Sequence, residues 1–152
     1  MAIVTFYRGD PKNAPKPTMP AHLGANAIIT CGGRLLLERR RDSDTWGLIG
    51  GGVKKSETTV QGLVREIYEE LGIRVQPDQL QKLQTYGDPG RIAAFQDGSV
   101  WRMVIAVYGL DFPREPQMRI SAESRELHFF TKEELKTTEI AVTHQDIVED
   151  WF

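Results

Sequence analysis

A helical pattern over residues 58–71 constrains the fold of this chain more than any other segment. At about 100° per residue, its apolar side chains fall on one arc, which predicts a helix with one buried face. Thr58 and Gln61 have the spacing of a capping box, and Gly72 is the kind of residue that commonly ends a helix. The buried face consists of Val60, Leu63, Val64, Ile67 and Leu71.

The other side of the predicted helix is acidic and carries Glu66, Glu69 and Glu70. Their i, i+3, i+4 spacing places three like charges together, at roughly 0.2–0.5 kcal/mol of destabilisation per pair. Arg65 can compensate one carboxylate, whereas the whole cluster is matched better by an oxygen-preferring divalent ion, Mg²⁺ or Mn²⁺. The alternative is a solvated acidic helix face without any ligand.

Three glycines, Gly50, Gly51 and Gly52, precede this helix. A glycine run lets the backbone fold tightly and present carbonyl groups to a metal or N–H groups to a phosphate. A strand, a glycine loop and an acidic helix in this order predict a pocket.

The rest of the chain indicates a mixed α/β domain. Apolar and β-branched runs predict strands over residues 2–8, 26–30, 34–40, 80–86, 100–110 and 127–131, and a second helix over residues 143–151. The proline-rich segment 10–20 predicts an irregular loop. Strands interspersed with helices favour a mixed sheet with helices packed on it, in a single domain over residues 1–152.

Charge and cysteine content exclude several classes of protein. Nineteen basic and 21 acidic residues leave a formal charge of −2, so no cationic excess favours DNA or an anionic membrane as a partner. The single cysteine, Cys31, cannot form an internal disulfide. The chain lacks a signal-peptide pattern and a long apolar run, and we therefore expect a cytoplasmic protein.

The segment from Gly51 to Ile73 resembles the Nudix box, G-x5-E-x7-R-E-U-x-E-E-x-G-U with U aliphatic, at every defined position. The preceding W-G-L-I-G-G is similar to the W-x-L-P-G-G that often leads into the box, with Ile49 where proline is common. Ser56 likewise replaces a frequent glycine. The chain therefore resembles the Nudix hydrolases, which implies an α/β/α sandwich around a mixed sheet.

The resemblance implies a metal-dependent pyrophosphohydrolase. Such an enzyme cleaves a nucleoside diphosphate linked to another moiety, here an ADP-ribose-like compound or a (d)NTP, by attack of water at phosphorus. The partner implied is a small-molecule nucleotide, with Mg²⁺ or Mn²⁺ as cofactor. The implied metal ligands are Glu66, Glu69, Glu70 and the carbonyl of Gly50.

The remaining catalytic candidates lie at the start of the box and outside it. Glu57 and Arg65 are expected to form an ion pair that holds the helix and the loop in register, and Glu57 could alternatively reach the metal through water. Some relatives take their general base from a loop before a late strand, which makes Glu123 the best-placed candidate here. The alternative for Glu123 is a solvated loop acid, and Glu69 completes the catalytic set.

Substrate contacts are less strongly indicated. The strand that ends in Arg39, Arg40 and Arg41 could contact phosphate or base through Arg39, although a charged strand end is the commoner explanation. Tyr86 could stack on a base, although a strand tyrosine more often lies in the core. Pro89 follows Ile73 by sixteen residues, a spacing that resembles ADP-ribose pyrophosphatases of the family, although a plain turn is the commoner explanation.

Other interpretations remain open at this point. His22, His128 and His144 have no metal-ligand spacing and are left out of the candidate site. A catalytically silent Nudix module that binds a nucleotide is the main alternative to an enzyme, and an RNA-directed activity is weakened by the charge balance. The sequence is also compatible with a homodimer.

Overall fold

The computed structural model describes residues 3–9 and 12–152. Its first strands precede helix α1, and its later strands lie between α1 and two C-terminal helices. In chain order, the elements are β1 (Val4–Arg8), β2 (His22–Cys31), β3 (Arg34–Arg40), β4 (Trp46–Gly47), β5 (Ile49–Gly52), α1 (Thr59–Leu71), the 3-10 turn η1 (Pro77–Gln79), β6 (Gln81–Tyr86), β7 (Arg91–Phe95), β8 (Val100–Phe112), β9 (Ser124–Phe130), α2 (Lys132–Leu135) and α3 (Val142–Trp151).

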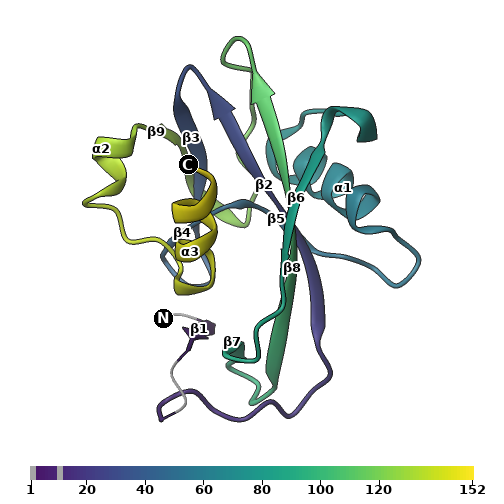
Figure 1. Ribbon diagram of the computed structural model, residues 1–152, viewed down its shortest axis with the longest axis vertical. Helices are drawn as coiled ribbons and strands as arrows, with labels where there is room; N and C mark the ends of the chain where they lie inside the picture. Colours follow the sequence, from purple (N-terminus) through teal and green to yellow (C-terminus); the bar gives the residue numbers. More distant parts are fainter. Residues whose placement is uncertain (1–2, 10–11) are drawn as a thin grey trace.

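The strands form a mixed sheet in the order β1-β7-β8-β2-β3-β4. β5 also pairs with β2, β6 with β8, and β9 with β3. The central pair, β2 and β8, is parallel, while the other pairs of strands are antiparallel. The two long central strands run side by side through the molecule (Figure 1).

Helices cover opposite faces of this sheet, because successive side chains of a strand point to opposite sides. Ile29 of β2 packs with Leu63 and Ile67 of α1 in one core cluster. Ile28 of the same strand packs with Ile147 of α3 in another. Figure 1 shows α1 and α3 on the two sides of the central strands. The expected α/β/α arrangement around a mixed sheet is thereby confirmed.

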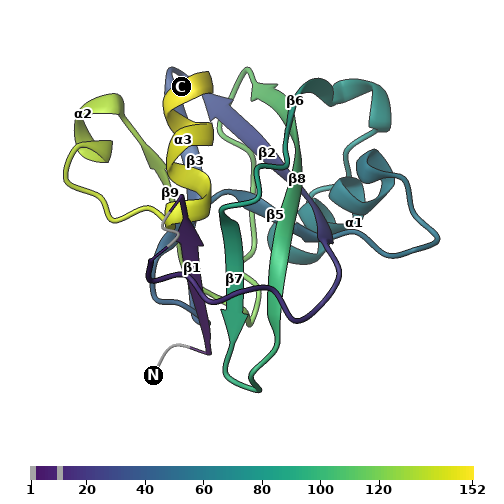
Figure 2. The same ribbon diagram turned by 60° about the horizontal axis from the view of Figure 1, so that its bottom comes forward.

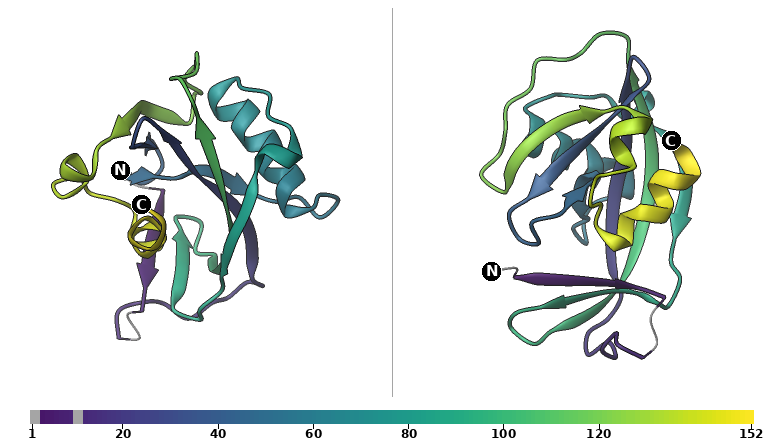
Figure 3. Two further views of the ribbon diagram at one scale, coloured as in Figure 1. Left: turned by 45° about the horizontal axis from the view of Figure 1, so that its top comes forward. Right: turned by 90° about the vertical axis from the view of Figure 1, so that its left-hand side faces the viewer.

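A separate arm of the sheet is formed near the N-terminus. β1 pairs with β7 over its whole length, from Val4 opposite Phe95 to Arg8 opposite Arg91. Beyond β1, the N–H of Ile3 donates to the carbonyl of Asp42, 2.7 Å away. Figures 2 and 3 show β1, β7 and the near end of β8 as an arm that lies beside the main sheet. This arm brings the N-terminal strand next to the turn that follows β3.

Most predicted elements are confirmed within a few residues. The predicted helix over 58–71 is α1, the strand over 34–40 is β3, and the second helix is α3. Residue 2 of the predicted first strand, and residues 10 and 11 of the predicted loop, lie outside the described residues, while 12–20 hold no helix or strand.

The prediction of a glycine loop is wrong. Gly50, Gly51 and Gly52 belong to strand β5, where they lie opposite Asn26, Ala25 and Gly24 of β2. Glycine has a low intrinsic preference for strands, so only the pairing with β2 makes this segment extended. In residues 3–9 and 12–152, no helix has the length and apolar character needed to cross a membrane.

Candidate active site

The ends of α1 are held by the side chains that the sequence places there. The hydroxyl of Thr58 accepts from the N–H of Gln61 at 3.2 Å, and the Gln61 side chain accepts from the N–H of Thr58 at 2.9 Å. Gly72 adopts a left-handed conformation with φ 73°. These two caps set the length of α1 and so fix which of its residues face β5.

Strand β5 approaches α1 and β2 so closely that only glycine fits. A Cβ on Gly50, whose φ is +142°, would lie 2.1 Å from the carbonyl oxygen of Ala25. A Cβ on Gly51 would lie 2.8 Å from the carboxylate carbon of Glu66. The N–H of Gly50 also faces Oε2 of Glu70, at 3.5 Å. The glycines therefore bring backbone directly against two of the predicted ligands.

A cavity of about 410 Å³ opens in front of these glycines. Carboxylates reach it from three directions, with Glu66 and Glu70 on α1, Glu38 on β3, and Glu123 in the loop before β9. The full lining is Ile3, Glu38, Arg40, Arg41, Asp42, Gly50, Gly51, Gly52, Glu66, Glu70, Ala122 and Glu123.

The carboxylates of this cavity repel one another. Glu70 is 4% exposed, and its pKa is raised well above the ordinary value by burial and by the neighbouring charges of Glu38 and Glu66. Burial also raises the pKa of Glu66 and that of Glu38. Arg40 lies nearby, but its guanidinium is bonded to Asp42 at 2.8 and 2.5 Å. The acidic cluster is therefore short of positive charge.

Arg65 connects the acidic helix to the strand and to the start of the box. Its Nε donates to Glu57 at 2.7 Å and its Nη2 donates to the Gly52 carbonyl at 2.8 Å. Its Nη1 donates to Glu66 at 3.0 Å and to Glu69 at 3.2 Å. The bonds from Arg65 lower the pKa of Glu57 to about 2. This guanidinium thus holds β5, the following turn and α1 in one register.

The chemistry of the donors fits a hard divalent cation. Buried, mutually repelling carboxylates beside a glycine backbone offer the oxygen ligands that Mg²⁺ and Mn²⁺ prefer. In the present side-chain conformations, no three His, Cys, Asp or Glu side chains of the described residues surround a common point as metal ligands would. Arg65 holds Glu66 and Glu69 instead, so a bound cation would have to share or displace these bonds.

Comparison with known proteins decides the family. The family model described as NUDIX domain matches residues 20–151. The chain belongs to the Nudix family.

Relatives agree with this assignment. A MutT-like protein from Streptomyces ambofaciens is 40% identical to this Nudix chain over 75 residues, which is 49% of each chain. The matched part thus spans about half the length of that relative. The MutT NUDIX hydrolase from Burkholderia pseudomallei has a similar structure, with a TM-score of 0.69 and 26% identity, covering 88% of this chain and 99% of that one. A Francisella tularensis NMN adenylyltransferase/ADP ribose pyrophosphatase, solved with AMP and a Mn ion, shares the fold with a TM-score of 0.67 and 20% identity, covering 88% and 42%.

The structure brings only some of the predicted Nudix site residues together. Gly50, Glu66, Glu70 and Glu123 line the cavity. The side chain of Glu69 is 54% exposed and lies outside the lining, bonded to Arg65. Glu57 is likewise outside the lining and acts on the site through Arg65.

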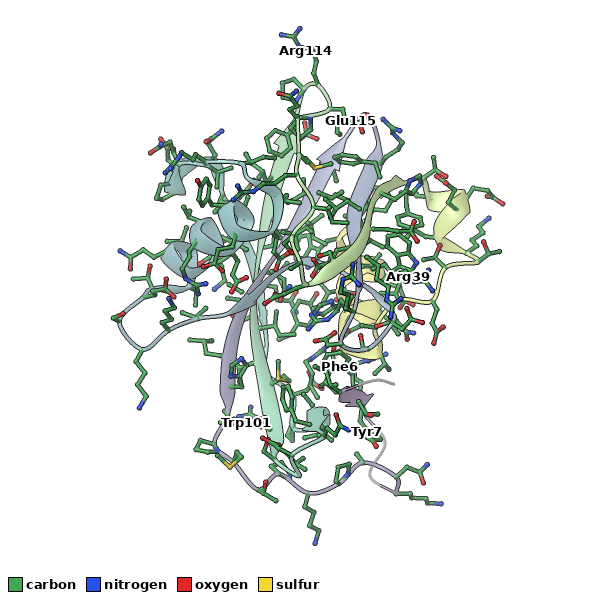
Figure 4. The ribbon with its side chains drawn as sticks, turned by 180° about the vertical axis from the view of Figure 1, so that it is seen from behind. Phe6, Tyr7, Arg39, Trp101, Arg114 and Glu115 are labelled. Atoms are coloured by element: carbon green, nitrogen blue, oxygen red, sulfur yellow. The ribbon has the colours of Figure 1, made fainter. Side chains whose placement is uncertain are left out.

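Both predicted substrate contacts lie away from the Nudix cavity. Arg39 points to the face of β3 opposite Glu38 and Arg40, and its guanidinium pairs with Asp44 at 3.2 Å and Glu126 at 3.3 Å. Figure 4 shows Arg39 among the side chains next to the neighbouring strand β9.

Tyr86 is buried on the side of α3. Its hydroxyl donates to Asp150 at 2.6 Å and accepts from the indole N–H of Trp151 at 3.0 Å. These bonds fasten the end of β6 to α3, on the opposite side of the sheet from α1.

The sequence analysis missed Glu38 as a residue of the cavity. Glu38 is 5% exposed and accepts a 2.6 Å hydrogen bond from the hydroxyl of Ser124. The signal was an acidic residue directly after three leucines of the same strand, in the same alternation as Arg40.

Proposed function

We propose that this Nudix protein is a metal-dependent pyrophosphohydrolase. It cleaves a nucleoside diphosphate linked to another moiety, an ADP-ribose-like compound or a (d)NTP, by attack of water at phosphorus. The observation that carries the proposal is the contact of Glu66 and Glu70 with glycine backbone inside one cavity. Buried like charges at this position are destabilising unless a ligand uses them.

The residues that would hold the cation are Glu66, Glu69, Glu70 and the carbonyl of Gly50. A diphosphate is repelled by these carboxylates, so it can bind in the cavity only with a cation between them. When bound, Mg²⁺ or Mn²⁺ would offset charge on the phosphoryl oxygens and make a bound water more acidic. Arg65 is bonded to both Glu66 and Glu69. Glu69 would therefore bind the cation together with Glu66 once the cation shares or displaces these bonds.

The other residues of the cavity orient the reactants. Arg40 and Arg41 also line the cavity. Because Arg40 is bonded to Asp42, Arg41 supplies the positive charge for phosphate. Glu123 accepts the proton of the attacking water as general base. The Glu57–Arg65 pair keeps β5 and α1 at the spacing that the diphosphate requires.

The test is a panel of ADP-ribose, nucleotide sugars, (d)NTPs and dinucleoside polyphosphates with Mg²⁺ or Mn²⁺, followed by separation of the products. Reaction in ¹⁸O-labelled water shows whether oxygen enters at phosphorus. The Glu70→Gln variant is the control for contaminating phosphatases. Binding of these nucleotides without turnover would overturn the proposal and favour the silent nucleotide-binding module.

A further inference from the structure

Glu38 of β3 lines the same cavity as Glu66 and Glu70, which we call the acidic cavity. Successive side chains of a strand point to opposite faces, so Glu38 shares its face of β3 with Leu36, two residues earlier. Leu36 belongs to the same core cluster as Leu63 of α1. The alternation of β3 thus brings a carboxylate to the helix that carries the acidic part of the Nudix box.

The carboxyl group of Glu38 is in contact with that of Glu70. The two side chains share a hydrogen bond, and Glu70 shares another with Glu66. Glu70 therefore lies between two other carboxyl groups, one from β3 and one from α1. Glu38 is 5% exposed and Glu70 is 4% exposed. Carboxylates in contact away from water repel one another unless a proton or a cation lies between them.

No side chain of the protein compensates this pair. Arg40 is bonded to the Asp42 carboxylate at 2.8 and 2.5 Å, and Arg65 pairs with three other glutamates. In residues 3–9 and 12–152, no basic side chain forms an ion pair with Glu38 or Glu70. The two most buried carboxylates of the acidic cavity are therefore the ones without a positively charged partner.

The Glu38 side chain is also held in a fixed orientation. The hydroxyl of Ser124 donates to its Oε2 at 2.6 Å, and carboxylates that bind metals are commonly hydrogen-bonded in this way by a second residue. The side chain of Glu69, in contrast, is 54% exposed and lies outside the cavity lining. Glu38 is therefore better placed than Glu69 to meet a cation in the acidic cavity.

We propose that Glu38 is a further ligand of the cation and binds it from β3, next to Glu70. The inference rests on the proposed function, because it needs the cation that the other glutamates and the carbonyl of Gly50 would hold. Mg²⁺ and Mn²⁺ prefer octahedral oxygen sites, so the groups supplied by α1 and β5 leave positions for another oxygen. Glu38 precedes the Nudix box, and this ligand is therefore not part of that motif.

The test is titration of the full chain with Mn²⁺, with free Mn²⁺ measured by its EPR signal, so that no turnover is needed. Glu38→Gln keeps the size of the side chain and can still accept from Ser124, but it loses the charge. We expect its dissociation constant for Mn²⁺ to rise by about tenfold or more. The rise should exceed that of Glu69→Gln, although Glu69 belongs to the box. Glu126→Gln is the matched control, since Glu126 is exposed and pairs with Arg39, and it should bind Mn²⁺ as the wild type does.

Two further variants separate a ligand from a distant charge and from a support of the loop. Glu38→Asp keeps the charge and withdraws the carboxylate by one methylene, so it should lose most of the affinity that Glu38→Gln loses, and it decides the matter if Glu38→Gln does not fold. Ser124→Ala leaves the carboxylate in place and should cost less. Wild-type affinity of either Glu38 variant, or equal losses in Ser124→Ala and Glu38→Gln, would overturn the inference.

The same titration distinguishes failure of the inference from failure of the proposed function. If the wild-type protein binds Mn²⁺ and the Glu38 variants bind it equally well, only the role of Glu38 is overturned. If the wild-type protein binds no Mn²⁺, the metal-dependent function is overturned, and the role of Glu38 is overturned with it.

Discussion

Ser124 donates a 2.6 Å hydrogen bond from its hydroxyl to Oε2 of Glu38, which joins the first residue of β9 to the floor of the acidic cavity. The residue before it is Glu123, whose carbonyl accepts from the N–H of Arg41 at 3.1 Å. Two bonds therefore fix the backbone on either side of the Glu123 side chain relative to β3. A loop acid held in this way is pre-organised, which a general base requires.

Glu123→Gln is expected to lower kcat by about 10²–10⁴-fold with little change in KM, because it removes the proton acceptor and retains the shape of the loop. Steady-state kinetics with the best substrate of the panel measures this. Glu126→Gln is the matched control, since Glu126 is exposed and pairs with Arg39 outside the cavity. A Glu123 variant with wild-type kcat would remove this residue from the mechanism.

Glu70→Gln is expected to abolish metal-dependent turnover without destabilising the metal-free protein. The raised pKa of Glu70 means that the folded state binds its proton more tightly than the unfolded state does. The contribution of Glu70 to stability is therefore lost as pH rises above the ordinary pKa of a carboxyl group. The Glu70→Gln variant has no such carboxyl group, so its stability does not fall for this reason.

Thermal unfolding at pH 8 with and without Mg²⁺ tests this prediction. Wild-type protein should gain stability from Mg²⁺, and Glu70→Gln should gain little. Glu69→Gln is the informative comparison, because Glu69 is more exposed, and we expect a smaller loss of turnover there. A metal-free Glu70→Gln protein that unfolds well below wild type would contradict the like-charge argument.

Alanine at two adjacent glycines should have different effects. Gly50→Ala places a Cβ 2.1 Å from the Ala25 carbonyl at a φ of +142°, so we expect loss of the folded state. Gly51→Ala meets the end of the flexible Glu66 side chain at 2.8 Å, so the fold survives while Glu66 is displaced. Circular dichroism and turnover of both variants check this: Gly51→Ala should be folded and at least tenfold less active.

Arg65→Lys should lower both stability and activity, because a single ammonium group cannot replace a guanidinium bonded to Glu57, Glu66, Glu69 and the Gly52 carbonyl. We expect a fall of about 2–6 °C in the thermal midpoint. Arg74→Lys is a control on an exposed arginine, and its midpoint should not move. Wild-type stability of Arg65→Lys would show that these bonds do not hold β5 to α1.

The stability of the protein should fall in mild acid because of His144. This side chain is buried, its Nδ1 accepts from the N–H of Leu48 at 3.1 Å, and burial lowers its pKa to about 3. The unfolded state binds the proton near pH 6.5 and the folded state does not, so stability is lost as pH falls from about 6.5 towards 3.

Urea unfolding at pH 7 and pH 5 measures this effect, which is on the order of 1 kcal/mol per pH unit within that window. The lowered pKa values of Asp42 and Asp146 also make the stability of the protein fall as pH falls. The contribution of His144 is therefore measured by comparing the pH dependence of variants with that of wild type. His144→Gln should show a weaker dependence on pH than wild type. His128→Gln, at an exposed histidine, should retain the wild-type dependence.

Helix α1 could be predicted because its determinants are local. The apolar arc, the Thr58 capping box and Gly72 lie within one short segment, and the structure confirms the helix and both caps. The same segment contains the Nudix box, so family and fold followed from residues close together in the sequence.

Strand β5 and the choice among the three arginines depend on distant parts of the chain. Gly50 to Gly52 become a strand only because β2 lies alongside. Which of Arg39 and Arg40 faces the cavity depends on the face of β3 that meets α1, and the pairing with β9 shifts register between these two residues. The alternation within residues 34–40 groups Glu38 with Arg40 on one face, but it does not say which face meets α1.

The parallel pairing of β2 with β8 joins His22 to Met103 and continues to Cys31 opposite Phe112. Partners roughly eighty positions apart must meet before this pair can form, and such closures make folding slow. The acidic cavity takes its carboxylates from β3 and α1, which lie between β2 and β8 in the sequence, and from the loop before β9, which follows β8. Chains that have formed only local structure therefore lack the assembled carboxylate cluster, and tight capture of a divalent ion should appear late in refolding, together with the native sheet.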